Sequence, residues 1–307
     1  MLGYMCAYLR YYHPAEFITS YLNNAANEND IKMGTTYAKK VGIQVTMPKW
    51  GVSKGEYFFD KTGTRIAKGL SSVKYMGEKV ADELYELSEN NNYTSFMEVL
   101  QGIYQHTSVN TAQLEILINI DFFSDFGNQR ELLEIVNLFY NMYKCGEAKK
   151  INKDKVDGTE IGYIISEYST GLTKAGQEAK QYTITDMQGL LKASEEYVMK
   201  ANLPDLEDIT KVRNFKKAMG YVGYVSGKEE DYRKFYVLDV YELKRKKDQK
   251  QFGYSVVCMS LGTGKESRFT VFNRVFEKDP LKEDDIFYCD AYTVEGIYFT
   301  LTAYHKI

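Results

Sequence analysis

The sequence predicts an α+β fold: a helical N-terminal region followed, from about residue 220 onward, by a small five-stranded β-barrel. Before residue 220 most apolar residues recur three and four positions apart, which is typical of amphipathic helices. After Gly220 the chain changes to short runs rich in Tyr, Phe, Val and Thr, separated by charged or glycine turns. With 307 residues, of which 44% are hydrophobic, the chain has room for about two domains, each with its own core.

Composition excludes several classes of protein. The four cysteines form no Cys-x-x-Cys pair and the chain has only three histidines, so neither a zinc site nor a disulfide scaffold is expected. The apolar stretch from Met1 to Leu9 is too short to span a bilayer and is closed by Arg10, so we expect no signal peptide, no membrane contact and a cytoplasmic location. A net charge of −3 excludes a uniformly basic nucleic-acid binder.

The first part of the chain divides into predicted helices and short strands. Helices are expected from Pro14, which suits a first helical turn, and over residues 31–40, ending at Gly42. A strand over 43–47 ends at Pro48, and residues 57–59 and 64–66 flank Lys61-Thr62-Gly63 as a hairpin. The pattern then predicts a helix, a tight turn and a helix over 69–87, and further helices over 95–104, 112–119 and 129–143.

The remaining elements lead to the barrel. Residues 146–180 are polar and aperiodic apart from 161–165, which predicts a linker or a loosely packed segment, and helices are expected over about 184–200 and 206–219. The five predicted strands are residues 235–243, 254–261, 269–272, 286–292 and 297–303. So many short strands in so short a segment favour an OB-like barrel.

Residues 69–81 have the pattern of a helix-hairpin-helix, in which a turn presents backbone N–H groups to a DNA phosphate and the next helix adds its N-terminal dipole. The predicted contacts are Val73, Lys74, Tyr75, Gly77 and Lys79. Residues 39–80 hold nine Lys or Arg against three acidic residues, which agrees with this interpretation. The alternative is a plain helical hairpin with surface lysines.

A second predicted DNA site lies on the barrel. The run Lys244-Arg245-Lys246-Lys247 falls between the first two predicted strands, in the loop that borders the nucleic-acid groove of an OB-fold. Aromatic residues on the second and third strands can stack bases. The predicted site therefore also includes Phe252, Tyr254, Arg268, Phe269 and, by the same alternation, Phe272. The alternative is a solvated hairpin loop, as most charge runs are.

The sequence offers no catalytic constellation. Two-metal nucleotidyl transfer needs clustered carboxylates, but no Asp-x-Asp occurs, and Asp205-x-Glu207 opens a helix, where acids favour the dipole. Gly262-Thr263-Gly264-Lys265 is similar to a phosphate loop, yet it lacks the earlier glycine and leads into a strand. We predict no catalytic residue, no metal ligand and no cofactor in this chain.

Residues 3–17, Gly-Tyr-Met-Cys-Ala-Tyr-Leu-Arg-Tyr-Tyr-His-Pro-Ala-Glu-Phe, resemble a signature of the bacterial DNA polymerase III alpha subunit, close to the end of its fingers. Three later blocks are similar to that family in the same order: 38–48, 65–74 and 114–130. The resemblance is dense over the first half of the chain. It is weaker from Met219 onward, where the family has an OB-fold.

The chain also departs from the family pattern. Tyr75 stands where the hairpin usually has the first glycine of Gly-x-Gly, and Asp121-Phe122-Phe123 replaces Gly-Ala-Phe. Gln188-Gly189-Leu190-Leu191 lies where the clamp-binding peptide is expected but lacks its aromatic residue. The family's phosphoesterase-like domain, its palm with the catalytic aspartates and most of its fingers have no counterpart in the sequence.

The resemblance implies the C-terminal portion of a replicative polymerase subunit: a remnant of the fingers (1–50), a helix-hairpin-helix domain near clamp and DNA (51–145), a linker with helices (146–219) and the barrel (220–307). It would hold template or primer DNA, including single strands, and contact the sliding clamp and other replisome subunits. Magnesium would belong to the palm, so the chain alone is expected to be inactive as a DNA-directed DNA polymerase. The alternatives are a protein-interaction module docking on a sliding clamp or polymerase core, and an independent enzyme.

Overall fold

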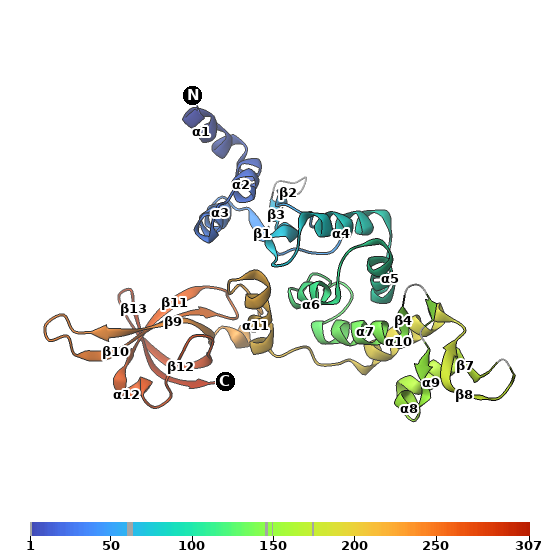
Figure 1. Ribbon diagram of the computed structural model, residues 1–307. Coiled ribbons are helices and arrows are strands. Elements are labelled where there is room, and N and C mark those ends of the chain that lie inside the picture. The colour runs from blue at the N-terminus through green and yellow to red at the C-terminus, as the bar shows by residue number, and fades with distance from the viewer. Residues whose placement is uncertain (1, 60–63, 145–146, 149, 174) are drawn as a thin grey trace. The chain divides into compact units, whose positions relative to one another are not determined.

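The computed structural model describes residues 2–59, 64–144, 147–148, 150–173 and 175–307. The chain divides into two compact units, residues 1–206 and 207–307 (Figure 1). Each unit has its own hydrophobic cores and is described separately.

The first unit begins with three helices, α1 (Leu2–Tyr12), α2 (Pro14–Asn23) and α3 (Glu28–Lys40). Apolar residues of α2 share a core with Ile66 of a small sheet, whose strands are ordered β1 (Gln44–Thr46), β3 (Arg65–Ala67), β2 (Phe58–Phe59). β1 is parallel to β3, and β2 is antiparallel to it. The antiparallel pair confirms the predicted flanks of the hairpin, whereas its turn at residues 61–63 lies outside the described residues.

The helix-hairpin-helix region turns between η1 (Leu70–Ser72), a single 3-10 turn, and α4 (Glu78–Asn90). It continues with α5 (Phe96–His106), α6 (Thr111–Asn119) and α7 (Gln129–Met142). Each of α5, α6 and α7 begins with a capping box, which pairs the amides of its N-cap residue and of its third helical residue within the chain. The predicted helices are confirmed, except that a 3-10 turn replaces the first helix of the hairpin.

Residues 147–201 are folded where they are described, which corrects the linker predicted for 146–180. β5 (Glu147–Ala148) pairs antiparallel with β4 (Tyr143–Lys144). After β5 come a sheet ordered β6 (Ile151–Asn152), β8 (Glu178–Ile184), β7 (Ser169–Leu172), and the helices α8 (Lys153–Val156), α9 (Glu160–Glu167) and α10 (Met187–Ala201). Ile165, Ile184 and Leu190 share a core with Met142 of α7. β4 to β7 are two to four residues long, which is too short for a detectable alternation, and the longer β8 consists mostly of polar residues.

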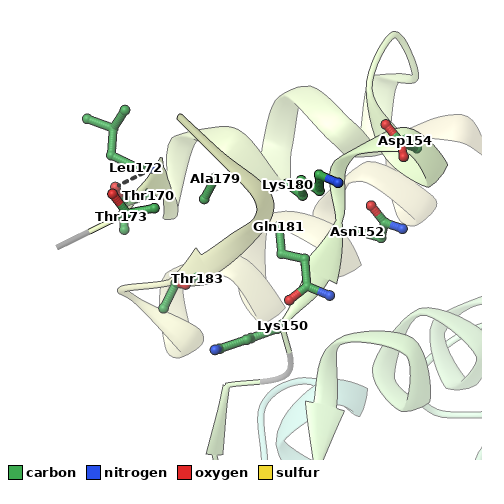
Figure 2. Close-up of a pocket in the computed structure, with 10 residues that line it drawn as sticks. All are labelled: Lys150, Asn152, Asp154, Thr170, Leu172, Thr173, Ala179, Lys180, Gln181 and Thr183. Atoms are coloured by element: carbon green, nitrogen blue, oxygen red, sulfur yellow. Dashed lines mark hydrogen bonds between the residues drawn. The ribbon is translucent and has the colours of Figure 1, made fainter. Parts of the chain in front are cut away.

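A pocket of about 1030 Å³ lies over the β6-β8-β7 sheet (Figure 2). Eight of the ten residues that line it have polar side chains, among them Lys150, Lys180, Gln181 and Thr183, and Asp154 is its acidic member.

The second unit is a closed five-stranded barrel, as predicted. Its strands are β9 (Lys234–Lys244), β10 (Gln251–Ser260), β11 (Glu266–Phe272), β12 (Ile286–Glu295) and β13 (Tyr298–Lys306). They pair in the order β10-β11-β13-β12-β9, and β9 closes onto β10. β11 and β13 are parallel, and the other neighbours are antiparallel. With the short helix α12 (Asn273–Phe276) between β11 and β12, this is an OB-like topology.

The second unit begins with α11 (Asp208–Met219), not at residue 220 as the change in composition suggested. Val212 of α11 is buried in a cluster with Tyr236, Met259 and Ile286 of the barrel. The Lys216 Nζ also lies 2.6 Å from an Asp284 carboxylate oxygen, next to β12. α11 therefore stabilises the barrel and is part of its domain, which also contains η2 (Glu229–Asp231).

Candidate nucleic-acid interface

Gly69 fixes the position of the hairpin in the first unit. Leu70 and Ser71 donate backbone hydrogen bonds to the carbonyl oxygens of Lys54 and Gly55, at 2.8 and 3.0 Å. A Cβ on Gly69 would lie 2.6 Å from the Cα of Glu56, so only glycine fits this approach of two backbone segments. The hairpin is thus held at its base by main-chain contacts.

Two buried side chains hold the turn of the hairpin in place. The side chains of Val73 and Met76 are buried, and the Met76 amide donates to the Val73 carbonyl at 3.1 Å. Val73 is among the predicted DNA contacts. Its side chain belongs to the core, so only its backbone is left for such a contact, which stays a prediction. Lys74 and Tyr75, between the two buried anchors, are exposed.

Tyr75 has a left-handed backbone with φ 65°, and it is the one aromatic residue with positive φ in the described part of the chain. For a residue with a Cβ this conformation costs roughly 1–2 kcal/mol. The Nε2 of Gln113, from the capping box of α6, donates to the Tyr75 carbonyl at 2.8 Å. The turn is therefore held by α6 as well as by its own core residues.

The N-terminus of α4 lies directly behind this turn and has no side-chain cap. Gly77 is the N-cap residue, and a Cβ there would meet nothing within 4 Å. Within the described residues, the amides of Glu78, Lys79 and Val80 have no hydrogen-bond acceptor. In α5, α6 and α7, by contrast, the N-cap side chain accepts a hydrogen bond from the third helical amide. Open first-turn amides and the helix dipole favour an anion at this position.

Lys79 is exposed beside these amides and makes a 3.6 Å ion pair with Glu83. The Glu83 carboxylate in turn accepts hydrogen bonds from the amide and hydroxyl of Ser108, at 2.6 and 2.7 Å. These bonds lower the pKa of Glu83 below its ordinary value. Glu83 therefore stays charged at neutral pH and ties α4 to the turn before α6.

On the barrel, the predicted basic loop is the β9–β10 connection. Residues 244–250 are all exposed, and the Arg245 amide donates to the Lys250 carbonyl at 2.9 Å to close the turn. Lys244 pairs with Glu242 at 3.2 Å. In the described part of the chain, Arg245, Lys246 and Lys247 have no acidic partner. The loop thus presents three unpaired cations to solvent.

The structure corrects the predicted stacking aromatics. Phe269 is only 3% exposed and packs in the barrel core against Phe235 and Phe287. Tyr254 also points inward, where its ring stacks on Phe276 with centroids 3.7 Å apart. Phe252 is half-buried next to Phe272, which is 48% exposed. Both alternating faces of these strands carry aromatic rings, so the sequence pattern could not show which face is inside.

The exposed aromatics lie elsewhere on the barrel. Tyr241 on β9 is in register with Ser255 on β10, which pairs with Thr270 on β11. Arg268, exposed on β11, is in register with Val257. The hairpin of β12 and β13 adds the exposed side chains Tyr292, Val294, Ile297, Tyr298 and Phe299 around Gly296. By strand order, the outer β10–β11 face is bordered by the basic loop on one side and this hairpin on the other.

Sequence reasoning missed Tyr241 and the β12–β13 hairpin. The signal for the hairpin was present, because Tyr292, Val294, Tyr298 and Phe299 surround a glycine turn too closely for all of them to be buried. Tyr241 gave a weaker signal. β9 has a register shift near Val237 and Asp239, so a count of alternating residues from Phe235 assigns Tyr241 to the wrong face.

The segment that stands in the interval of the family's clamp-binding peptide is part of a helix. Gln188-Gly189-Leu190-Leu191 lies in the first turn of α10, and both leucines are buried. These apolar side chains stabilise the first unit and are not available to a partner.

Among the described residues, no group of three or more His, Cys, Asp and Glu side chains is arranged to hold a metal ion. No described helix is both long and apolar enough to cross a membrane.

The fold and these surfaces define a class of protein: a helix-hairpin-helix region joined to an OB-like barrel. A profile of the family described as "Helix-hairpin-helix motif" matches residues 42–133. DNA polymerase III subunit alpha of Treponema pallidum is 33% identical over 135 residues, which are 43% of this chain and 11% of that protein. The same subunit of Borreliella burgdorferi is 27% identical over 194 residues, which are 62% of this chain and 16% of that protein. The subunit of Ureaplasma parvum is 22% identical over 205 residues, which are 60% of this chain and 21% of that protein.

The chain is thus partly homologous to bacterial DNA polymerase III alpha subunits, and it spans about a tenth to a fifth of the length of these relatives. The homology, the helix-hairpin-helix match and the barrel agree with the C-terminal region of that subunit, as the sequence predicted.

Proposed function

We propose that this chain holds DNA as a C-terminal segment of a DNA polymerase III alpha subunit. The hairpin binds a backbone phosphate through the open amides of α4 and the cations Lys74 and Lys79. The outer face of the barrel binds a single strand between the basic loop and the β12–β13 hairpin. The observation that supports this most directly is the uncapped N-terminus of α4 behind an exposed, firmly held turn.

A Gly77→Asp substitution tests the hairpin. A carboxylate at the N-cap pairs with the first-turn amides and repels phosphate, and it stabilises the helix by up to about 1 kcal/mol. We expect duplex affinity to fall about tenfold while the unfolding free energy of the first unit is unchanged or increased. Fluorescence anisotropy with a labelled duplex measures the first quantity, and urea unfolding followed by Trp50 fluorescence the second.

Gly51→Asp is the matched control, because it adds the same charge at an exposed glycine of the same unit that begins no helix. Gly51 has φ 72°, which aspartate tolerates better than most residues. Equal losses of affinity in both variants would mean that net charge alone matters, and the hairpin would not be a phosphate site.

The barrel is tested by changing Lys244, Arg245, Lys246 and Lys247 to Ser. The slope of log affinity against log salt is about −0.7 for each neutralised phosphate of a single strand, so three or four contacts give roughly −2 to −3. We expect the variant to flatten that slope and keep the fold, because the loop is exposed. Anisotropy titrations at several salt concentrations measure it. Identical slopes for the original chain and the variant would mean that the loop does not contact DNA, and would favour the protein-docking alternative.

Contacts with a sliding clamp and other replisome subunits, and a cytoplasmic location, stay predictions. We infer that DNA synthesis requires carboxylates from outside this chain, in a palm that would bind magnesium.

A further inference from the structure

Tyr75 combines an unfavourable backbone conformation with an exposed side chain that packs against no other part of the described protein. Its φ of 65° is a conformation typical of glycine, asparagine and aspartate, not of aromatic residues. The ring is 76% exposed, and no ring or cation contact to it exists among the described residues. Packing within the protein therefore does not offset the strain. Strained residues of this kind concentrate at sites where a ligand is bound.

The backbone of Tyr75 is held in place, although its ring makes no contact of its own. The Gln113 side chain holds the Tyr75 carbonyl at 2.8 Å, and Gln113 is itself fixed by its capping box with Asn110. Buried Val73 and Met76 hold the turn on both sides. A fixed backbone presents the ring without a further loss of backbone freedom on binding, so only the side-chain torsions of Tyr75 remain to be ordered.

The neighbours of Tyr75 define what the ring would meet. Lys74 is exposed next to it, and the open amides of Glu78, Lys79 and Val80 begin three residues further on. A phosphate held there would bring the adjoining sugar and base toward the turn that carries Tyr75. In a continuous duplex that base is stacked and paired, so the ring meets only sugar and phosphate. An unpaired base offers its π-face, and such stacking raises affinity roughly five- to hundredfold.

We propose that Tyr75 stacks on an unpaired base, so that the hairpin recognises DNA at a junction between duplex and single strand. This rests on the proposed phosphate site of the hairpin and adds the class of DNA that it selects. The phosphate contacts give affinity for any DNA backbone, and Tyr75 gives the preference for an exposed base.

The test compares a blunt duplex with the same duplex carrying one unpaired 2-aminopurine nucleotide. The full chain is used with Lys244, Arg245, Lys246 and Lys247 changed to Ser, so that the barrel loop does not contribute. We expect this protein to bind the overhang at least about fivefold more tightly than the blunt duplex and to quench the fluorescence of the unpaired base.

Three variants separate the ring from the backbone. Tyr75→Phe keeps the ring and should keep both the preference and the quenching. Tyr75→Asn suits the left-handed backbone but has no ring, so it should bind both DNAs with the blunt-duplex affinity and quench nothing. Tyr75→Gly also lacks the ring, so like Tyr75→Asn it should show no preference for the overhang and no quenching. Trp50 fluorescence confirms that each variant is folded.

The outcomes distinguish this inference from the proposed function. No overhang preference in the protein with Tyr75, or a preference that survives in Tyr75→Asn, overturns the stacking role, while binding that is lost in Gly77→Asp keeps the phosphate site. Blunt-duplex binding that Gly77→Asp leaves unchanged overturns the proposed function of the hairpin itself.

Discussion

Replacing Gly69 by alanine is expected to lower the unfolding free energy of the first unit by about 3 kcal/mol or more. The new Cβ would lie 2.6 Å from the Cα of Glu56 and closer still to the Gly55 carbonyl oxygen. All of these are backbone atoms, which cannot rotate away as a side chain can. The segments would have to separate, and the bonds from Leu70 to Lys54 and from Ser71 to Gly55 would lengthen or break.

Trp50 makes this measurable without interference from the barrel. It is the single tryptophan of the chain and packs against Phe122 and Phe123 in the first unit. Urea unfolding followed by its fluorescence reports that unit, while circular dichroism reports both. Gly55→Ala is the control, because its Cβ would have its nearest neighbour at 3.5 Å, an ordinary contact. We expect the control to change stability by less than about 1 kcal/mol. Similar losses in both variants would contradict the proposed role of the close approach.

The same hairpin shows how far the sequence could be interpreted. The glycine at 69, the basic balance around it and the helical periodicity after it were sufficient to predict the motif, because they depend on local backbone chemistry. Tyr75 and Asp121 both stand where the resemblance leads one to expect glycine, and both keep positive φ, at 65° and 62°. Both positions thus adopt the left-handed backbone that favours glycine, without a glycine. Which ligand the new side chains serve could not be predicted from their positions alone.

The barrel gave the opposite lesson. Its five strands were predicted correctly because Tyr, Phe, Val and Thr favour strands whichever way they face. The assignment of rings to the outer face failed at Phe269 and Tyr254, since inside and outside are decided by strand pairing and by shifts such as the one between Gln251 and Gly253 on β10. The place of α11 was missed for a similar reason: Val212 is buried only because residues far along the chain cover it.

Lys68 is expected to make the first unit more stable at alkaline pH than at neutral pH. It precedes Gly69, its amide donates to the Thr46 carbonyl at 3.0 Å, and the residue is only 8% exposed. Burial lowers the pKa of Lys68 from 10.5 to about 8. The charged form is therefore disfavoured in the folded chain relative to the unfolded chain.

The pKa of Lys68 sets the pH window. Below about pH 8 Lys68 is protonated in both states, and the folded state bears the full penalty of a buried charge. Between about 8 and 10.5 the unfolded chain binds a proton that the folded chain does not, so stability rises with pH. From pH 7 to about 9.5 the gain is about 2 kcal/mol.

Lys68→Met removes the titrating group and keeps an apolar chain of similar length. Its unfolding free energy should lack this rise. The unfolding free energy of the variant minus that of the original chain should therefore fall by about 2 kcal/mol between pH 7 and about 9.5. Interactions of the amine that change with its protonation are already contained in its pKa in the folded chain, and a loss that does not depend on protonation drops out of that comparison. Urea unfolding by Trp50 fluorescence at both pH values measures the difference. If the original chain and the variant gain or lose stability in parallel, Lys68 is charged and solvated in the folded state, and the base of the hairpin is open to water.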